Sequence, residues 1–115
     1  MLFTKKINSN RDFVFLFKKG QSIVGKSVVI YYKKNNSPYN RIGIASSKKI
    51  GNAVKRNRAR RVIRAAYYEC EKLFPIGYNI IIVARHSATF VKSTSIKNFF
   101  IEKVIPKMCE IEKKW

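Results

Sequence analysis

Acidic residues are scarce in this sequence. It contains six Asp and Glu residues against 25 Lys and Arg, which gives a formal net charge of +19 over 115 residues. The acids are also segregated, because none occurs between Asp12 and Glu69. A chain with this charge repels copies of itself, so we expect a polyanionic partner in the cell, with nucleic acid as the leading candidate.

Cysteine, histidine and long apolar runs are scarce as well. Cys70 and Cys109 lack CxxC spacing and His86 is the sole histidine, so we expect ordinary thiols and an ordinary surface imidazole, not a disulfide or zinc site. The longest aliphatic run, residues 80–84, is too short to span a membrane, and the first ten residues contain no signal-peptide core. These absences predict a cytoplasmic protein without a membrane partner.

The apolar content is that of a folded protein. Hydrophobic residues make up 46% of the chain, with only 5 Gly and 3 Pro, and the length suits a single domain spanning residues 1–115. Apolar spacing predicts an α+β fold in the order helix, three strands, helix, strand, helix. The expected helices are residues 9–20, opened by Ser9 and Asp12 as a capping box, 52–73, and 95–112 with a kink at Pro106. The expected strands are residues 22–24, 28–32, 42–46 and 78–84.

The middle helix carries the densest positive charge. Residues 47–64 read SKKIGNAVKRNRARRVIR and contain eight basic side chains and no acid. One side of the helix is expected to be apolar, formed by Val54, Ala59, Val62, Ile63, Ala66 and Cys70 after an Asn52 cap. Helices favour anions in the first turn and cations in the last, and this helix inverts the preference. The inversion favours a polyanion-binding surface over a merely solvated basic face.

The first helix has more apolar surface than one core contact requires. Phe13, Leu16 and Phe17 share one face, while Val14 and Phe15 lie partly on another. Each ring alone is explained equally well by core packing, but the set indicates an aromatic surface with a second use.

These residues resemble a known family. The stretch SKKIGNAVKRNRARRVIRAAY is similar to the RNR motif of the bacterial ribonuclease P protein subunit. The resemblance extends to NRDFVFLFKKG, VVIYY, RIGIASSKKIGNAV and the aliphatic strand near Ile80, and it weakens after His86. One departure is Arg60, where the family commonly has lysine; the charge is kept and the hydrogen-bonding geometry differs. The resemblance implies a central sheet of about four strands with an unusual left-handed crossover through the basic helix, against the general rule.

The resemblance also implies a function. Members of the family are protein cofactors of a catalytic RNA that removes the 5′ leader from precursor transfer RNA, so this chain is expected to contact both RNAs. The motif positions expected to bind the RNA subunit are Lys48, Lys49, Asn52, Arg56, Asn57, Arg58, Arg60, Arg61 and Arg64. Those expected to bind the leader are Phe13, Phe17 and Tyr31, by stacking on unpaired bases. Magnesium is expected as a cofactor held mainly by the RNA; no organic cofactor and no protein partner are implied.

Other functions fit the sequence less well. A protein-only nuclease gathers carboxylates around metal ions, and the six acids here are scattered, so no catalytic residue is expected in the protein. A structural RNA-binding protein, such as a small ribosomal component, would share the charge and the size but needs no separate aromatic groove. Membrane-surface binding is weaker still, because the basic helix carries no Trp or Phe anchor on its apolar side.

Overall fold

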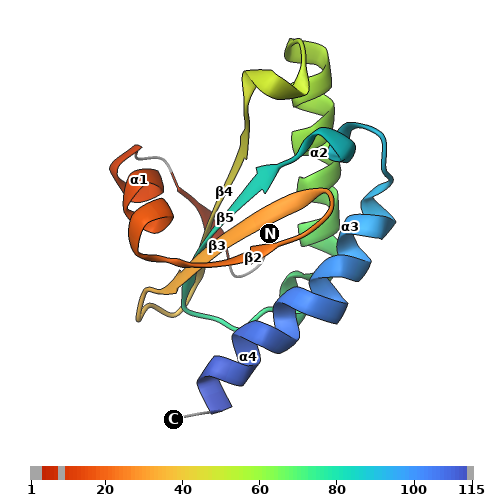
Figure 1. Cartoon of the computed structure of the whole chain (residues 1–115). Coiled ribbons are helices and arrows are strands. Elements are labelled where there is room, and N and C mark those ends of the chain that lie inside the picture. Colours follow the sequence, from red (N-terminus) through yellow and green to blue (C-terminus); the bar gives the residue numbers. More distant parts are fainter. Residues whose placement is uncertain (1–3, 8–9, 114–115) are drawn as a thin grey trace.

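The computed structural model describes residues 4–7 and 10–113 (Figure 1). Ser9, the expected first-helix cap, lies outside the described residues. The strands are β1 (Thr4–Lys6), β2 (Gln21–Val24), β3 (Val28–Lys34), β4 (Asn40–Ser46) and β5 (Tyr78–Ala84). The helices are α1 (Asn10–Lys19), α2 (Ala53–Cys70), α3 (Ser93–Phe99) and α4 (Ile105–Lys113). The predicted α+β class and the order of the seven expected elements are confirmed.

The strands form one mixed sheet in the order β1-β4-β5-β3-β2. β1, β4 and β5 are parallel, whereas β3 runs antiparallel to β5 and β2 antiparallel to β3. The sheet therefore has five strands, not about four, and β1 is the strand that the sequence did not predict. Its three residues, Thr-Lys-Lys, have no apolar alternation, as is common for a short edge strand protected by lysine.

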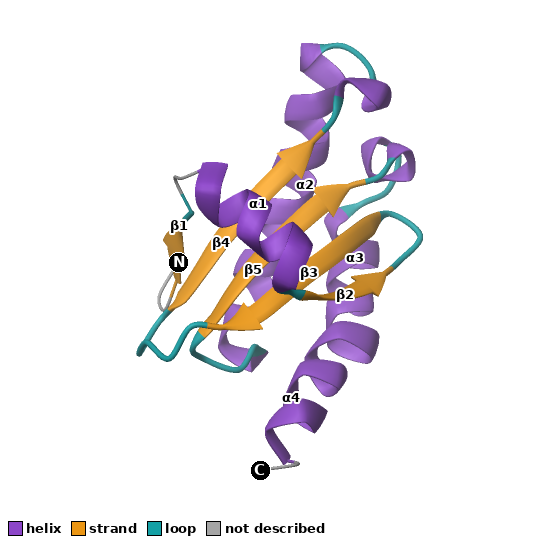
Figure 2. Cartoon of the chain, turned by 60° about the vertical axis from the view of Figure 1, so that its left-hand side comes forward, coloured by secondary structure: helices purple, strands orange, loops and turns teal. Residues whose placement is uncertain are grey.

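Alternation along the strands divides the sheet into two faces. In β3, Val28, Ile30 and Tyr32 point into the main core, while Tyr31 points to the opposite face. Figure 2 shows α1 in front of the sheet and α2 behind it. The main core lies between the sheet and α2, α3 and α4, and a smaller cluster under α1 contains Leu16 and Ile81.

The connection from β4 through α2 to β5 has the unusual hand. In Figure 2 both strands point upward, β5 lies to the right of β4, and α2 passes behind the sheet. Seen from the side of α2, the chain therefore steps to the left, which makes the crossover left-handed. The family resemblance implied this feature, and the general preference of parallel crossovers for the right hand argues against it.

Helix ends deviate modestly from the sequence prediction. α1 ends at Lys19, and the N–H of the following Gly20 donates to the Leu16 carbonyl at 2.8 Å; a Cβ on Gly20 would lie 2.6 Å from the same oxygen, which explains the glycine. α2 ends at Cys70, three residues early, and a 3₁₀ turn, Glu71–Leu73, completes the segment. The last helical segment starts at Ser93, and a π-helical turn, Phe100–Val104, precedes Pro106, so hydrogen bonding is irregular before the proline where a kink was expected.

Candidate nucleic-acid interface

The basic helix α2 is anchored by its cap and by one apolar side. The Asn52 side chain accepts a hydrogen bond from the Lys55 N–H at 3.0 Å, which confirms the predicted cap. The buried residues of the helix are Ala59, Ile63, Ala66, Tyr67 and Cys70. Val54 was expected on this side but is 73% exposed, because it lies in the first turn, where the helix extends beyond the core; Val62 is only partly buried. The rest of the surface of α2 carries its Lys and Arg side chains, together with the exposed Tyr68 and Glu69 near its end.

The arginines of α2 differ in how firmly they are held. Arg60 donates to the Ser46 hydroxyl at 2.8 Å and to the Asn57 side-chain oxygen, which orients its guanidinium along the edge of β4. Arg58 donates through Nε to the Thr89 carbonyl at 3.0 Å, so its terminal nitrogens stay available. Arg61 and Arg64 are exposed. The helix thus presents both hydrogen-bonded and solvent-exposed cations, and no acid occupies its first turn.

The two predicted lysines lie beside the start of this helix. Lys48 and Lys49 are exposed on a 3₁₀ turn, Lys48–Ile50, whose third residue, Ile50, is buried in the main core. The buried isoleucine fixes the turn, so both lysines extend the basic surface of α2 at the end of β4.

The three predicted aromatic residues meet on the other face of the sheet. The Phe17 and Tyr31 ring centroids are 4.9 Å apart in an edge-to-face arrangement, and those of Phe13 and Phe17 are 6.4 Å apart. Phe17 remains 43% exposed. Tyr32 is buried on the core face, so the register places Tyr31, and not its neighbour, beside α1. We call Phe13, Phe17 and Tyr31 the aromatic patch.

A groove links the aromatic patch to the basic helix. It has a volume of about 230 Å³, and its lining includes Phe13 and Gly43 on the α1 side and Arg60 and Arg64 on the α2 side. It opens at the edge of β4 beyond Ile42, which is the last residue of β4 that pairs with β1. Phe13 of the aromatic patch and Arg60 and Arg64 of the basic helix, which the sequence placed in separate sets, therefore line one groove.

Gly43 is a residue that the sequence analysis missed. A Cβ built on it would lie 2.5 Å from Cζ of Phe13, so the ring rests directly on the backbone of β4. The period-two alternation of the predicted strand places Gly43 on the face that carries Tyr31, but only the strand pairing shows that it lies under α1. The absence of a side chain here shapes the groove floor.

Cys70 and His86 are the other side chains that the sequence singled out. Cys70 is buried, its Sγ donates to the Ala66 carbonyl, and burial raises the pKa of its thiol to about 11. His86 is exposed and lies beside Phe90 in a tilted arrangement, with ring centroids 5.2 Å apart. Within residues 4–7 and 10–113, no three His, Cys, Asp or Glu side chains are grouped to hold a metal ion. In the same residues, no helix is both long and apolar enough to cross a membrane.

Comparison with known proteins identifies the family. The chain matches the Ribonuclease P family over residues 1–107. The ribonuclease P protein component of Clostridioides difficile is 46% identical over 101 residues, which cover 83% of this chain and 88% of the relative. That of Oceanobacillus iheyensis is 40% identical over 93 residues, covering 80% and 77%. This chain belongs to the Ribonuclease P family, whose members act in the processing of transfer RNA.

Solved structures agree with this assignment. The Staphylococcus aureus RNase P protein superposes with a TM-score of 0.74 at 34% identity and covers 87% of this chain and 96% of that one. The Thermotoga maritima RNase P protein gives a TM-score of 0.78 at 24% identity, with 90% and 96% covered, and shares the fold. Family membership implies a partnership with ribonuclease P RNA.

Proposed function

We propose that this chain is the protein subunit of a cytoplasmic ribonuclease P, which binds the catalytic RNA and the 5′ leader of precursor transfer RNA and assists magnesium-dependent removal of that leader. The supporting observation is the groove in which Phe13 faces Arg60 and Arg64 across the edge of β4. A groove with an aromatic ring on one side and arginines on the other suits a single strand of RNA, because the ring can contact a base while the arginines contact phosphates.

The basic side of α2 would bind the RNA subunit. The residues proposed for this contact are Lys48, Lys49, Asn52, Arg56, Asn57, Arg58, Arg60, Arg61 and Arg64. Arginine forks bind phosphate oxygens through paired, charge-assisted hydrogen bonds. Asn52 caps α2 and Asn57 accepts from Arg60, so these two amides would act largely by holding the backbone and one guanidinium in place.

The aromatic patch would bind the leader. A single strand exposes base faces, and stacking on an aromatic ring contributes about 1–3 kcal/mol per base with little dependence on sequence. Phe17 is the ring most available for stacking because it is 43% exposed, and its edge-to-face contact with Tyr31 holds it in place. Phe13 is partly buried against the cluster of Leu16 and Ile81, so it would form the wall of the groove.

The chemistry would belong to the RNA. The acids of the protein are dispersed: Asp12 pairs with Arg41, Glu69 pairs with Lys97, and Glu71 is buried against Thr4. Such separate carboxylates do not form a magnesium site, so the ions would be held mainly by the RNA subunit. The protein would position substrate and reduce repulsion between the two RNAs.

The decisive experiment is cleavage of precursor transfer RNA at low magnesium. Three reactions are compared: a bacterial ribonuclease P RNA alone, that RNA with this protein, and the protein alone. We expect stimulation only in the combined reaction. Tight RNA binding without stimulation would overturn the proposal in favour of a structural RNA-binding protein, and cleavage by the protein alone would overturn the assignment of the chemistry to RNA.

A further inference from the structure

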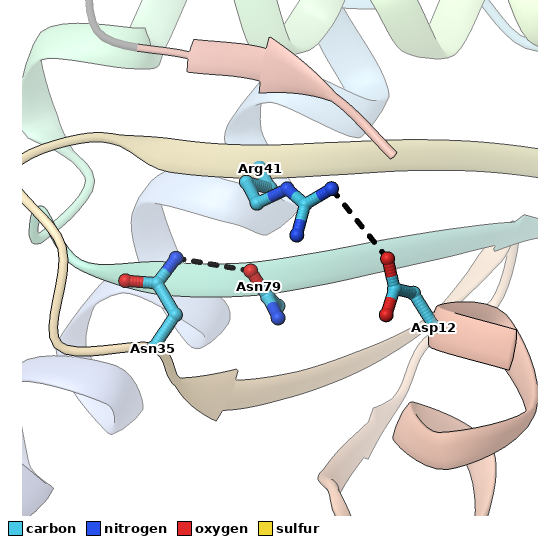
Figure 3. Close-up of polar contacts among 4 residues, drawn as sticks. All are labelled: Asp12, Asn35, Arg41 and Asn79. Atoms are coloured by element: carbon cyan, nitrogen blue, oxygen red, sulfur yellow. Dashed lines mark hydrogen bonds and ion pairs between the residues drawn. The ribbon is translucent and has the colours of Figure 1, made fainter. Parts of the chain in front are cut away.

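A polar cluster lies on the same face of the sheet as the aromatic patch. It consists of Asp12 from α1, Arg41 from β4, Asn79 from β5 and Asn35, which follows β3 (Figure 3). Arg41 of β4 is paired in register with Asn79 of β5. Two residues further along β5, Ile81 is paired with Tyr31 of β3. Two residues along a strand span about 7 Å, so the polar cluster adjoins the aromatic patch.

The orientation of the Asn79 amide is fixed by a chain of hydrogen bonds. The Ser37 backbone N–H donates to Oδ1 of Asn35 at 2.9 Å, so Nδ2 of Asn35 must be the group that faces Asn79. That nitrogen donates to Oδ1 of Asn79 at 2.9 Å. The amino group of Asn79 therefore points away from Asn35, and among the described residues it has no acceptor.

Arg41 and Asp12 complete a site of mixed character. Arg41 Nη2 lies 3.5 Å from Asp12 Oδ2, and the two side chains are 36% and 33% exposed. The arginine and Asn79 offer donors, and the carboxylate offers acceptors next to them, while the formal charges of the pair cancel. Asp12 is also the sole acid in the first 68 residues, and it lies beside an arginine on the proposed RNA-binding face.

This arrangement suits a neutral nucleoside group better than a phosphate. A backbone phosphate carries negative charge and presents acceptors alone, so the Asp12 carboxylate would repel it. A base edge or a ribose 2′-hydroxyl presents both a donor and an acceptor. The geometry points to the polar cluster as a subsite for such a donor–acceptor group of a single-stranded RNA whose neighbouring base stacks on the aromatic patch. This inference rests on the proposed leader binding.

The alternative is that the ion pair simply attaches α1 to the sheet. An ion pair whose side chains are about one-third exposed contributes little to stability, and attachment does not require the oriented amide of Asn79. Attachment and binding also differ in what they change: loss of an attachment lowers the unfolding midpoint, whereas loss of a binding group lowers affinity for one class of RNA.

The test measures affinity of the reconstituted holoenzyme for precursor transfer RNA with a leader of several nucleotides, and for mature transfer RNA. The variants are Asn79→Ala, Arg41→Gln and Asp12→Asn, with Asn98→Ala, an exposed residue of α3, as the matched control. We expect each of the three to weaken binding of the precursor by about five- to tenfold, as for one or two lost hydrogen bonds, with mature transfer RNA and the control unchanged. Urea unfolding of each variant checks the fold.

Two features of the data separate a neutral group from a phosphate. For a neutral group, Arg41→Gln leaves the slope of log K against log salt unchanged, whereas loss of a phosphate contact lowers it by about 0.7. Asp12→Asn weakens binding here, but would tighten it if a phosphate occupied the site. A lowered slope, tighter binding by Asp12→Asn, or equal losses for precursor and mature transfer RNA would overturn the inference.

Modified leaders identify the source of the group. The loss caused by Asn79→Ala should vanish with a 2′-deoxy leader if the group is the ribose hydroxyl, and with an abasic leader if it is a base edge. Persistence of the full loss with both leaders would contradict the subsite. Phe17→Ala, measured in parallel, separates the two proposals: if it also leaves precursor affinity unchanged, leader binding itself is wrong, whereas a selective effect of Phe17→Ala alone rejects only the subsite.

Discussion

The contact between Phe13 and Gly43 gives the sharpest energetic prediction. In Gly43→Ala, the new Cβ would lie 2.5 Å from the ring, against an ordinary limit near 3.4 Å, so the ring must move by about 1 Å. Overpacking of this kind costs about 1–3 kcal/mol. Alanine in place of a strand glycine returns about 0.5–1 kcal/mol of conformational entropy. Because the clash involves the tip of a partly buried ring, we expect a net loss of about 0.5–1 kcal/mol.

Removing the ring should reverse the sign of this effect. In a Phe13→Ala background the clash is absent, so Gly43→Ala should stabilise the protein by about 0.5 kcal/mol through the entropy term alone. Urea unfolding of the wild type, the two single variants and the double variant gives the coupling energy, expected at about 1 kcal/mol or more. An equal effect of Gly43→Ala in both backgrounds would refute the contact and, with it, the groove floor described above.

Three further predictions follow from the basic helix and its thiol. Alanine in place of Arg56, Arg58 and Arg61 together should weaken binding of the RNA subunit and lower the slope of log K against log salt by about 2, as measured by a filter-binding titration; an unchanged slope would remove these residues from the interface. Asn52→Ala should lower the free energy of unfolding by about 1 kcal/mol, whereas Asn52→Ser should nearly preserve it. The pKa of Cys70 is raised to about 11 in the folded protein. The folded state therefore keeps a proton that the unfolded state loses as the pH rises through about 9. Cys70 should thus contribute a fall in the free energy of unfolding from about pH 9 to 11. Cys70→Ala should remove that part of the pH dependence of urea unfolding, and a profile identical to the wild type would contradict the buried thiol.

Local sequence patterns predicted the elements that the core requires. The sequence signal is clear in β3 and β5 because these strands bury about every second residue or more. It is clear in α2 because the helix buries about every third to fourth residue. β1 escaped prediction because its stability comes from pairing with β4 and from Ile7, whose N–H donates to Ile42, not from a pattern of its own. The exposure of Val54 was missed for a related reason: periodicity assigns a side of the helix but not the point at which the helix leaves the core.

One part of the candidate site can be predicted from local sequence, whereas the other part depends on the tertiary structure. The arginines from Arg56 to Arg64 lie on consecutive turns of one helix, so the sequence alone predicts that they are close in space. Arg41, Asn79 and Asp12 come from two strands and a helix, and their proximity depends on strand order and register that no local pattern contains.

The left-handed crossover explains why the two parts of the surface meet. Figure 2 shows that it carries α2 from β4 to β5 behind the sheet, while α1 covers the front, so both helices border β4. Phe13 of α1 and Arg60 of α2 can line one groove because β4 has β1 on its outer side over only part of its length. A longer β1 would cover that edge and separate the aromatic patch from the arginines. The shortness of β1, which hid it from sequence analysis, is therefore also the feature that leaves the groove open.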